Sequence, residues 1–292
     1  MAVDFQPGCP LRFRAMNSHR WLPLLGLAAL TAVAEPARHF TVAWTNNLLT
    51  VTHPDLPGGK LEVLYLEAFL SHGAHGQGWN KSKLPHHTTL LTTNREQTRL
   101  GFRTTVAPEV EVTHEVKAGT DALELTFTFT NHGTNQADVQ WFQPACIRLA
   151  DFTGRDQAGY TARSFVFTTN GLTTLDRLQR TTNALYLGGQ VFVPRWTAEA
   201  DANPRPLAHD RLANGLIGCF SADGRWLLAT ASDRTHELFE GVYVCLHSDP
   251  LIDGLKPGET KHMRQMIYLL PNDPAALLRR YRRDFPESMR RW

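Results

Sequence analysis

Hydrophobic and polar residues alternate along several stretches of this chain, which is the period of a β-strand with one buried face. In the clearest stretch, 123–130, leucine and phenylalanine take the odd positions, and glutamate and threonine take the even ones. Similar runs, separated by Asn-Asn, Asp-Gly and Pro-Gly turns, predict strands at 40–52, 61–66, 90–105, 110–116, 139–147, 215–220, 226–231, 241–247 and 266–270. We therefore predict a mainly β protein, an antiparallel β-sandwich.

The pattern changes to a helical period near the end of the chain. Asp273 suits a helix N-cap and Pro274 the first helical position. An apolar stripe at helical spacing follows, made of Leu277, Leu278, Tyr281 and Phe285. We expect one C-terminal helix, at about 273–285, packed on the β body.

Three stretches show no clear period. Residues 71–89, rich in glycine, histidine, serine and lysine, are interpreted as a long loop. Residues 150–212 are interpreted as long excursions from the β core, and the charged residues 233–237 as another loop. Long loops on a rigid scaffold are where binding sites commonly form.

The first 34 residues have the order of a signal peptide. Arg12, Arg14 and Arg20 precede an apolar stretch at 22–33, and Ala-Val-Ala at 32–34 fits a cleavage site. The apolar stretch is shorter than the roughly 20 residues that span a bilayer, and an uncleaved anchor is the alternative. We predict a secreted or periplasmic protein with a single domain at 35–292 and no membrane contact after cleavage.

The charge and cysteine content of the chain bear on nucleic-acid binding and on disulfide bonds. The formal net charge of +2 gives no electrostatic basis for binding nucleic acid. With Cys9 in the leader, the odd set Cys146, Cys219 and Cys245 is not a disulfide framework. Buried free thiols are expected, with a Cys219–Cys245 bond as the alternative in an exported protein.

Cofactor and metal signals are weak in this sequence. It contains no phosphate-binding loop, dinucleotide fingerprint, Gly-x-Ser-x-Gly or His-Glu-x-x-His motif, so we predict no cofactor. Zinc or copper could be bound by a group of four histidines, His72, His75, His86 and His87. Because no regular element is expected to hold them and no cysteine joins them, we predict no metal site there.

Two parts of the chain carry a family resemblance. In the part at 110–150, a strand ends in Thr130-Asn131, a polar turn follows, and 139–144 read Val-Gln-Trp-Phe-Gln-Pro. In the part at 215–270, 241–250 read Gly-Val-Tyr-Val-Cys-Leu-His-Ser-Asp-Pro, and 255–259 read Leu-Lys-Pro-Gly-Glu. This order resembles the aldose 1-epimerase (galactose mutarotase-like) family. The resemblance implies a β-supersandwich and a carbohydrate partner.

Both catalytic positions of that family differ in this chain. Where the family has a histidine as general acid, this chain has Trp-Phe-Gln-Pro at 141–144, and His247 stands where the family has a glutamate as general base. Mutarotation needs a base for the anomeric hydroxyl proton and an acid for the ring oxygen. We therefore expect a carbohydrate-binding or carbohydrate-processing protein without standard mutarotase activity.

A relocated acid–base pair would centre on His247. Asp249 lies two residues away and would share its face on one strand. The candidate catalytic set is His247, Asp249, Glu237, Glu240 and His236. In the alternative interpretation, 247–250 is a strand end that enters a turn, with Asp249 bonded to local backbone.

Candidate binding residues lie mainly in the irregular stretches. Trp79 and Trp196 offer flat faces for sugar rings, and Arg163 and Arg195 suit the carboxylates of acidic sugars, while Gln143 stands near the family's acid position. Core packing is the alternative for the aromatic residues. Three functions stay open: a carbohydrate-binding module, a sugar epimerase, lyase or hydrolase that uses His247 with a carboxylate, and an envelope-associated structural protein.

Overall fold

A computed structural model describes residues 39–72, 79–106, 109–184, 188–195 and 205–289. The predicted leader at 1–34 and Cys9 lie outside the described residues, so cleavage and export stay predictions. The described residues belong to one compact unit, Ala37–Trp292. They form a mainly β structure, as the alternation predicts.

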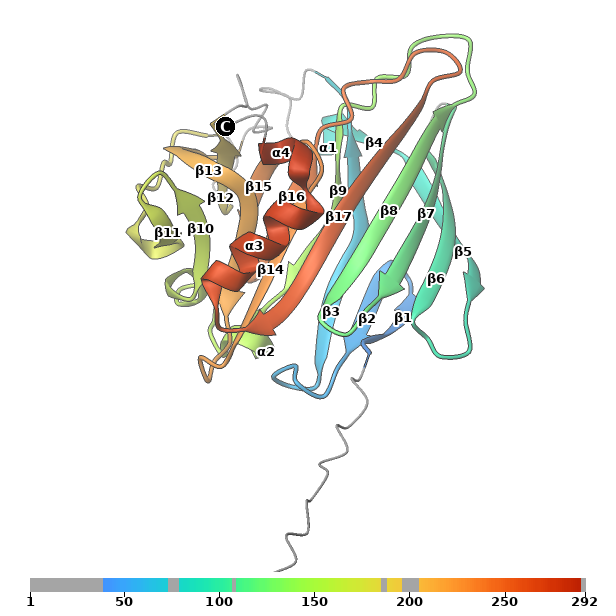
Figure 1. Cartoon of the computed structure of the whole chain (residues 1–292). Coiled ribbons are helices and arrows are strands. Elements are labelled where there is room, and N and C mark those ends of the chain that lie inside the picture. The colour runs from blue at the N-terminus through green and yellow to red at the C-terminus, as the bar shows by residue number, and fades with distance from the viewer. Residues whose placement is uncertain (1–38, 73–78, 107–108, 185–187, 196–204, 290–292) are drawn as a thin grey trace, which may run out of the picture. The chain divides into compact units, whose positions relative to one another are not determined.

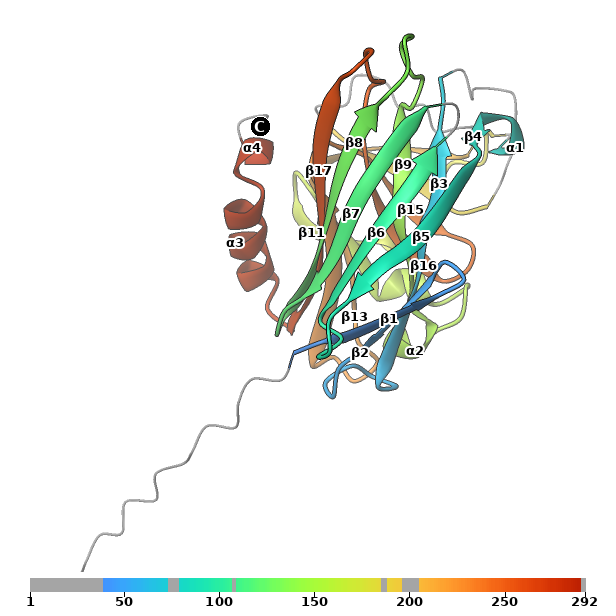
Figure 2. The ribbon, with the colours of Figure 1, turned by 90° about the vertical axis from the view of Figure 1, so that its right-hand side faces the viewer.

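One layer of the structure is a run of nine antiparallel strands (Figures 1 and 2). In spatial order these strands are β5 (His86–Thr93), β6 (Arg99–Val106), β7 (Val110–Ala118), β8 (Ala122–Asn131), β17 (Thr260–Pro271), β14 (Trp226–Ser232), β13 (Leu207–Phe220), β10 (Ser164–Thr168) and β11 (Gly171–Thr174).

The second layer contains seven strands. They are β1 (Thr41–Thr45), β2 (Leu48–Thr52), β3 (Lys60–Leu70), β9 (Trp141–Arg148), β16 (Cys245–Pro250), β15 (Thr235–Gly241) and β12 (Gln190–Pro194). The two-residue β4 (Lys83–Leu84) pairs antiparallel with the end of β3. Because β12 also pairs in parallel with the first part of β13, the two layers are joined at that point. The architecture is a β-sandwich.

Apolar side chains of both layers meet in one core. Leu49 and Val63 of the second layer and Phe127 and Phe129 of the first belong to the same buried cluster. The odd positions of 123–130 therefore face inward, as their alternation predicts.

The C-terminal helix forms a further layer outside the sandwich (Figure 2). Helix α3 (Pro274–Asp284) begins at Asp273, whose carboxylate accepts hydrogen bonds from the backbone N–H groups of Ala275 at 2.9 Å and Ala276 at 3.0 Å. Its apolar stripe, with Leu277 and Tyr281 at the centre, packs against β14 and β17. The prediction of a terminal helix is confirmed, and a short helix, α4 (Pro286–Met289), follows it.

Two sequence predictions are wrong in part. Residues 71–89 are not one loop, because they contain α1 (Trp79–Ser82), β4 and the start of β5. Residues 241–247 are not one strand, because the chain turns at 242–244 with Val244 at a φ of 51°. Tertiary contacts hold this turn, since Gln157 accepts from the Val244 N–H and the Leu149 N–H donates to the Val244 carbonyl.

The irregular stretches contain more order than their composition indicates. Residues 235–241, within and after the predicted charged loop, form strand β15, which is buried along its length. Residues 150–212 include helix α2 (Ala150–Thr153), two 3₁₀ turns (Tyr160–Ala162 and Leu175–Arg177), and β10, β11, β12 and the start of β13. Among the described residues, no helix has the length and apolar character needed to cross a membrane.

Three polar side chains in the apolar core are linked by hydrogen bonds. The Tyr65 hydroxyl is hydrogen-bonded to His114 Nδ1 at 2.7 Å, and His114 Nε2 is hydrogen-bonded to Thr104 Oγ1 at 2.9 Å. Burial lowers the pKa of His114 to about 3, so the ring is neutral at physiological pH. Both ring nitrogens have a partner, which removes the cost of burying them.

We expect Tyr65→Phe to destabilise the fold by about 1–3 kcal/mol, because His114 Nδ1 is left buried without its partner. Urea unfolding of the variant measures this. The control is Thr128→Val, which breaks a hydrogen bond to His262 at the surface and should change stability by less than about 0.5 kcal/mol. Equal effects in the two variants would contradict the structural role of these hydrogen bonds.

Candidate functional site

The candidate site lies on the outer face of the second layer, along strand β16. Leu246 points into the core between the layers. Cys245, His247 and Asp249 alternate with it and therefore share the opposite face. All three are at most 2% exposed. The prediction that His247 and Asp249 share one face of a strand is confirmed, and the strand-end and turn interpretation of 247–250 is wrong.

His247 sits between two kinds of group. Its Nε2 lies 3.6 Å from Cys245 Sγ and 4.0 Å from Glu67 Oε2, and its Nδ1 lies 3.7 Å from Asp249 Oδ1. Burial by itself would lower the pKa of His247, but Asp249 and Cys245 outweigh it and hold the pKa well above its usual value. The ring therefore has an acidic neighbour on each side.

Strand β9 supplies two further members of the site. The Gln143 side-chain amide donates a 3.0 Å hydrogen bond to Asp249 Oδ2 and so fixes that carboxylate. Cys146 Sγ lies within 4.8 Å of Cys245 Sγ, and this neighbouring thiol lowers the pKa of Cys245 to about 4, against the effect of burial and with help from His247. The proximity of Cys245, together with burial, raises the pKa of Cys146.

Two β-bulges aim side chains at this face. On β3, Leu66 and Glu67 together oppose the single residue Pro144 of β9, and Leu66 takes a φ of 53°. Pro144 has no N–H to offer a regular ladder, so its place opposite a bulge avoids a lost hydrogen bond. On β15, His236 is the extra residue between Thr235 and Glu237.

A buried ion pair forms the other end of the site. Arg205 pairs with Glu237 on β15, and its guanidinium lies 4.5 Å from the Phe239 ring centre and 5.3 Å from that of Trp141. Glu237 stands directly opposite Asp249 in the β15–β16 ladder. Burial raises the pKa of Glu237 to about 7, opposed by Arg205 and reinforced by Asp249.

The structure gathers some predicted site residues and separates others. His247, Asp249, Glu237 and Gln143 lie together, and the His236 ring lies 5.6 Å from that of Trp141. Glu240 points to the opposite face of β15, where it pairs with Arg180, so its predicted partnership with His247 is wrong.

Of the predicted binding residues that the structure describes, Gln143 lies beside His247 and Asp249, whereas Arg163 and Arg195 lie elsewhere. Arg163 donates to the Ser221 carbonyl, and Arg195 is exposed at the end of β12. Trp196 and the Trp79 side chain lie outside the described residues. Gln143 is buried, and its side-chain amide donates a hydrogen bond to Asp249.

Sequence reasoning missed Cys146, Cys245 and Glu67 as site residues. The spacing Cys-x-His-x-Asp at 245–249 has the period of a strand face and was the available signal for Cys245. Glu67 and Cys146 reach the site only through strand pairing. The three described cysteines, Cys146, Cys219 and Cys245, are free thiols, as expected.

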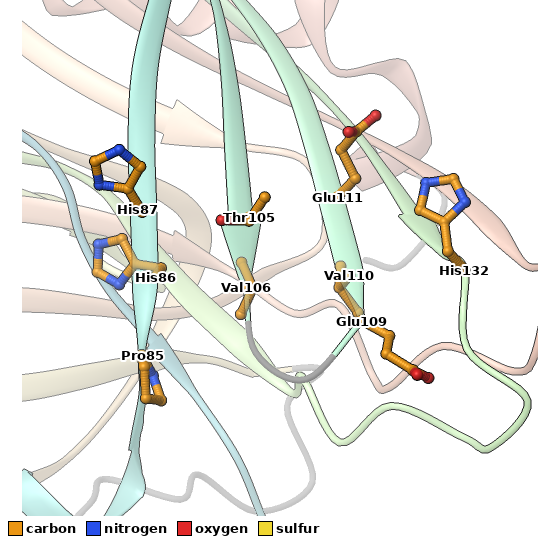
Figure 3. A pocket seen from close by; sticks show the side chains of 9 residues that line it. All are labelled: Pro85, His86, His87, Thr105, Val106, Glu109, Val110, Glu111 and His132. Atoms are coloured by element: carbon orange, nitrogen blue, oxygen red, sulfur yellow. The ribbon is translucent and has the colours of Figure 1, made fainter.

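The histidines at 72–87 do not form one cluster among the described residues. His72 pairs with Asp138, and His86 Nε2 is hydrogen-bonded to the Leu66 carbonyl at 3.0 Å, while His75 lies outside the description. His86 and His87 instead border a groove of about 610 Å³ on the first layer, with Glu109, Glu111 and His132 (Figure 3). This groove lies over β5, β6 and β7 and does not include His247.

Comparisons with known proteins give a fold resemblance. No protein-family model matches the chain, and no curated protein matches it. Among solved structures, a putative aldose 1-epimerase from Escherichia coli K12 shares 10% identity and a TM-score of 0.41, over 80% of this chain and 100% of that one. A galactose mutarotase-like protein from Lactobacillus casei shares 10% identity and a TM-score of 0.39, over 79% and 100%.

A third structure, the Slr1438 protein from Synechocystis, shares 9% identity and a TM-score of 0.43, over 80% of this chain and 96% of that one. At these identities and TM-scores, the likeness to aldose 1-epimerase and galactose mutarotase-like structures is one of fold alone. The role of each residue has to come from the geometry of its own site.

Replacing Arg205 should reveal the protonation state of Glu237. We expect Arg205→Met to destabilise the fold by about 3–5 kcal/mol at pH values above 7, because a buried carboxylate loses its counter-ion. Below the Glu237 pKa of about 7 the carboxyl group is neutral and needs no counter-ion. The loss of stability caused by Arg205→Met should therefore become smaller as the pH falls towards 5.

Urea unfolding at both pH values measures this difference. The control, Arg225→Met, breaks an exposed pair with Asp223 and should cost less than about 1 kcal/mol. If Arg205→Met loses the same amount of stability at both pH values, Glu237 stays ionised throughout this pH range.

Proposed function

We propose that this protein binds a carbohydrate on the outer face of β3, β9, β16 and β15 and acts on it by proton transfer. The catalytic version of the carbohydrate hypothesis is favoured over a pure binding module because acids and bases gather on one face. A structural protein would have little reason to bury so many titratable groups together.

The observation that carries this proposal is a set of carboxylate oxygens without hydrogen bonds. Among the described residues, Glu67 Oε2, Glu237 Oε2 and Asp249 Oδ1 are buried and accept none. Buried polar atoms in native proteins normally have a partner. Three acceptors on one face suit a ligand that carries several donors, and the hydroxyl groups of a sugar have that character.

The same groups supply an acid and a base. Glu237, with a pKa raised to about 7, carries a proton in part of the population near neutral pH and suits the role of general acid. Glu67, whose side chain is 31% exposed, lies at the open edge and suits the role of general base. The reaction we propose is opening and reclosing of a sugar hemiacetal by this relocated pair, which departs from the sequence-based expectation of a protein without standard mutarotase activity.

The sequence resemblance supports a sugar as the ligand. His247 stands at the position of the family's general base, and the carboxylates Glu67, Glu237 and Asp249 surround that position. An acid–base pair moved to neighbouring strands is consistent with a family scaffold that lacks the usual histidine and glutamate.

We expect the purified protein to accelerate anomer interconversion of a sugar from an oligosaccharide and monosaccharide panel, followed by NMR of the anomeric protons. Glu237→Gln and Glu67→Gln should each lower the rate about 100-fold or more. For the wild type, activity should fall as the pH rises through about 7, because Glu237 loses its proton.

The matched control is Glu240→Gln, which changes the same residue type on the same strand but on the opposite face. It should keep the rate and the pH profile. Reducing-end release or formation of an unsaturated product would assign hydrolysis or elimination instead. Absence of both binding and turnover across the panel would end the carbohydrate proposal.

We also propose that the protein is exported and that residues 1–34 are removed. The support is the order of basic residues, apolar stretch and Ala-Val-Ala at 32–34. N-terminal sequencing of the expressed protein should find Glu35 first. An intact leader on the membrane-bound protein would instead indicate an uncleaved anchor.

A further inference from the structure

Two thiols and an imidazole converge at one point of the site. Cys146, Cys245 and His247 each offer a ligand atom, and these atoms all lie within 4.8 Å of one another. Each of the three residues is 2% exposed. Among the described residues this is the one group of at least three such side chains.

These two cysteines differ from a cysteine that only fills space. Cys219 belongs to the main apolar cluster between the layers, beside residues such as Ile217 and Leu228. Cys146 and Cys245 belong to none of the apolar clusters of the described residues and face His247 on the outer side. Packing alone does not account for their placement.

We propose that Cys146 Sγ, Cys245 Sγ and His247 Nε2 bind a Zn²⁺ ion. Zinc bonds of about 2.3 Å to sulfur and about 2.0 Å to nitrogen place the two ligand atoms about 3.5 Å apart in a tetrahedral site. The separation of Cys245 Sγ and His247 Nε2 is 3.6 Å. Two thiolates neutralise the charge of the ion, so the buried unit carries no net charge.

The surroundings of His247 have the form that zinc ligands usually have. Asp249 Oδ1 lies on the Nδ1 side of the ring at 3.7 Å, longer than a hydrogen bond, and its charge favours the tautomer with the proton on Nδ1, which leaves the Nε2 lone pair facing the thiols. Gln143 in turn holds Asp249 through a 3.0 Å hydrogen bond. His247 as a ligand, Asp249 as the carboxylate behind it, and Gln143 as the hydrogen-bond donor to Asp249 are therefore all present.

Glu67 marks the fourth position and the entry path. Its Oε2 lies 4.0 Å from His247 Nε2, and its side chain is 31% exposed whereas the three ligands are buried. Three protein ligands with an oxygen position at the open side form the pattern of a catalytic rather than a structural zinc site.

The test uses the full chain, reduced, freed of metal with a chelator, and titrated with Co²⁺ as a visible substitute for zinc. We expect one Co²⁺ per chain, with intense tetrahedral d–d bands and a thiolate-to-metal charge-transfer band, both lost when Zn²⁺ is added. Cys146→Ser and Cys245→Ser should each weaken the charge-transfer band and lower the affinity at least tenfold. Asp249→Asn should lower the affinity about 10–100-fold with the band kept.

The matched control is Cys219→Ser, which changes a buried free thiol of the core and should leave the titration unchanged. If the cysteine variants fail to fold, alkylation of the wild type decides, because bound metal should slow labelling of Cys146 and Cys245 and not of Cys219. Binding without a thiolate band, equal labelling of all three cysteines, or no stoichiometric binding would overturn the proposal.

This inference does not depend on the carbohydrate proposal. Cobalt binding by a protein that recognises no sugar would leave the zinc site standing and end only the proposed function. A Cys146–Cys245 disulfide that, once reduced, yields thiols without metal affinity would overturn the zinc site and leave the proposed function untouched.

Discussion

The pairing of β16 between β15 and β9 is the constraint on which the site depends. Antiparallel pairing fixes which side chains of β16 enter the core and which face outward, and a shift of one residue would exchange the two sets. Leu246 is held in the core, so Cys245, His247 and Asp249 are held together outside it. The site is a consequence of register more than of any single contact.

The outer face of β16 joins two kinds of chemistry. At one end, Cys245 and Cys146 provide soft thiol ligands, and at the other, Asp249 and Glu237 provide buried carboxyl groups. His247 contacts both ends, one through each ring nitrogen. A substitution at either end therefore alters the surroundings of His247 and, through its ring, those of the groups at the other end.

Irregularities in the second layer shape the site as much as its regular strands do. The bulge at Leu66 and Glu67 opposite Pro144 brings a carboxylate towards His247, and the bulge at His236 brings a ring beside Trp141. Bulges commonly re-aim side chains in this way. Arg205 then lies against Phe239 and Trp141 and pairs with Glu237, which gives that buried carboxyl group a counter-ion.

The sequence by itself determined the strands with strong alternation, such as 123–130, the capped helix after Asp273, and the shared face of His247 and Asp249, because each follows from spacing along a single element. Tertiary structure decided the turn at 242–244, the burial of the charged strand 235–241, and the outward or inward direction of Glu237 and Glu240. It also brought Glu67 and Cys146 to His247, and Arg205 to Glu237, from positions that are distant along the chain. Local periodicity carries no information on which strands become neighbours, and that choice is made by the burial of apolar surface between the two layers.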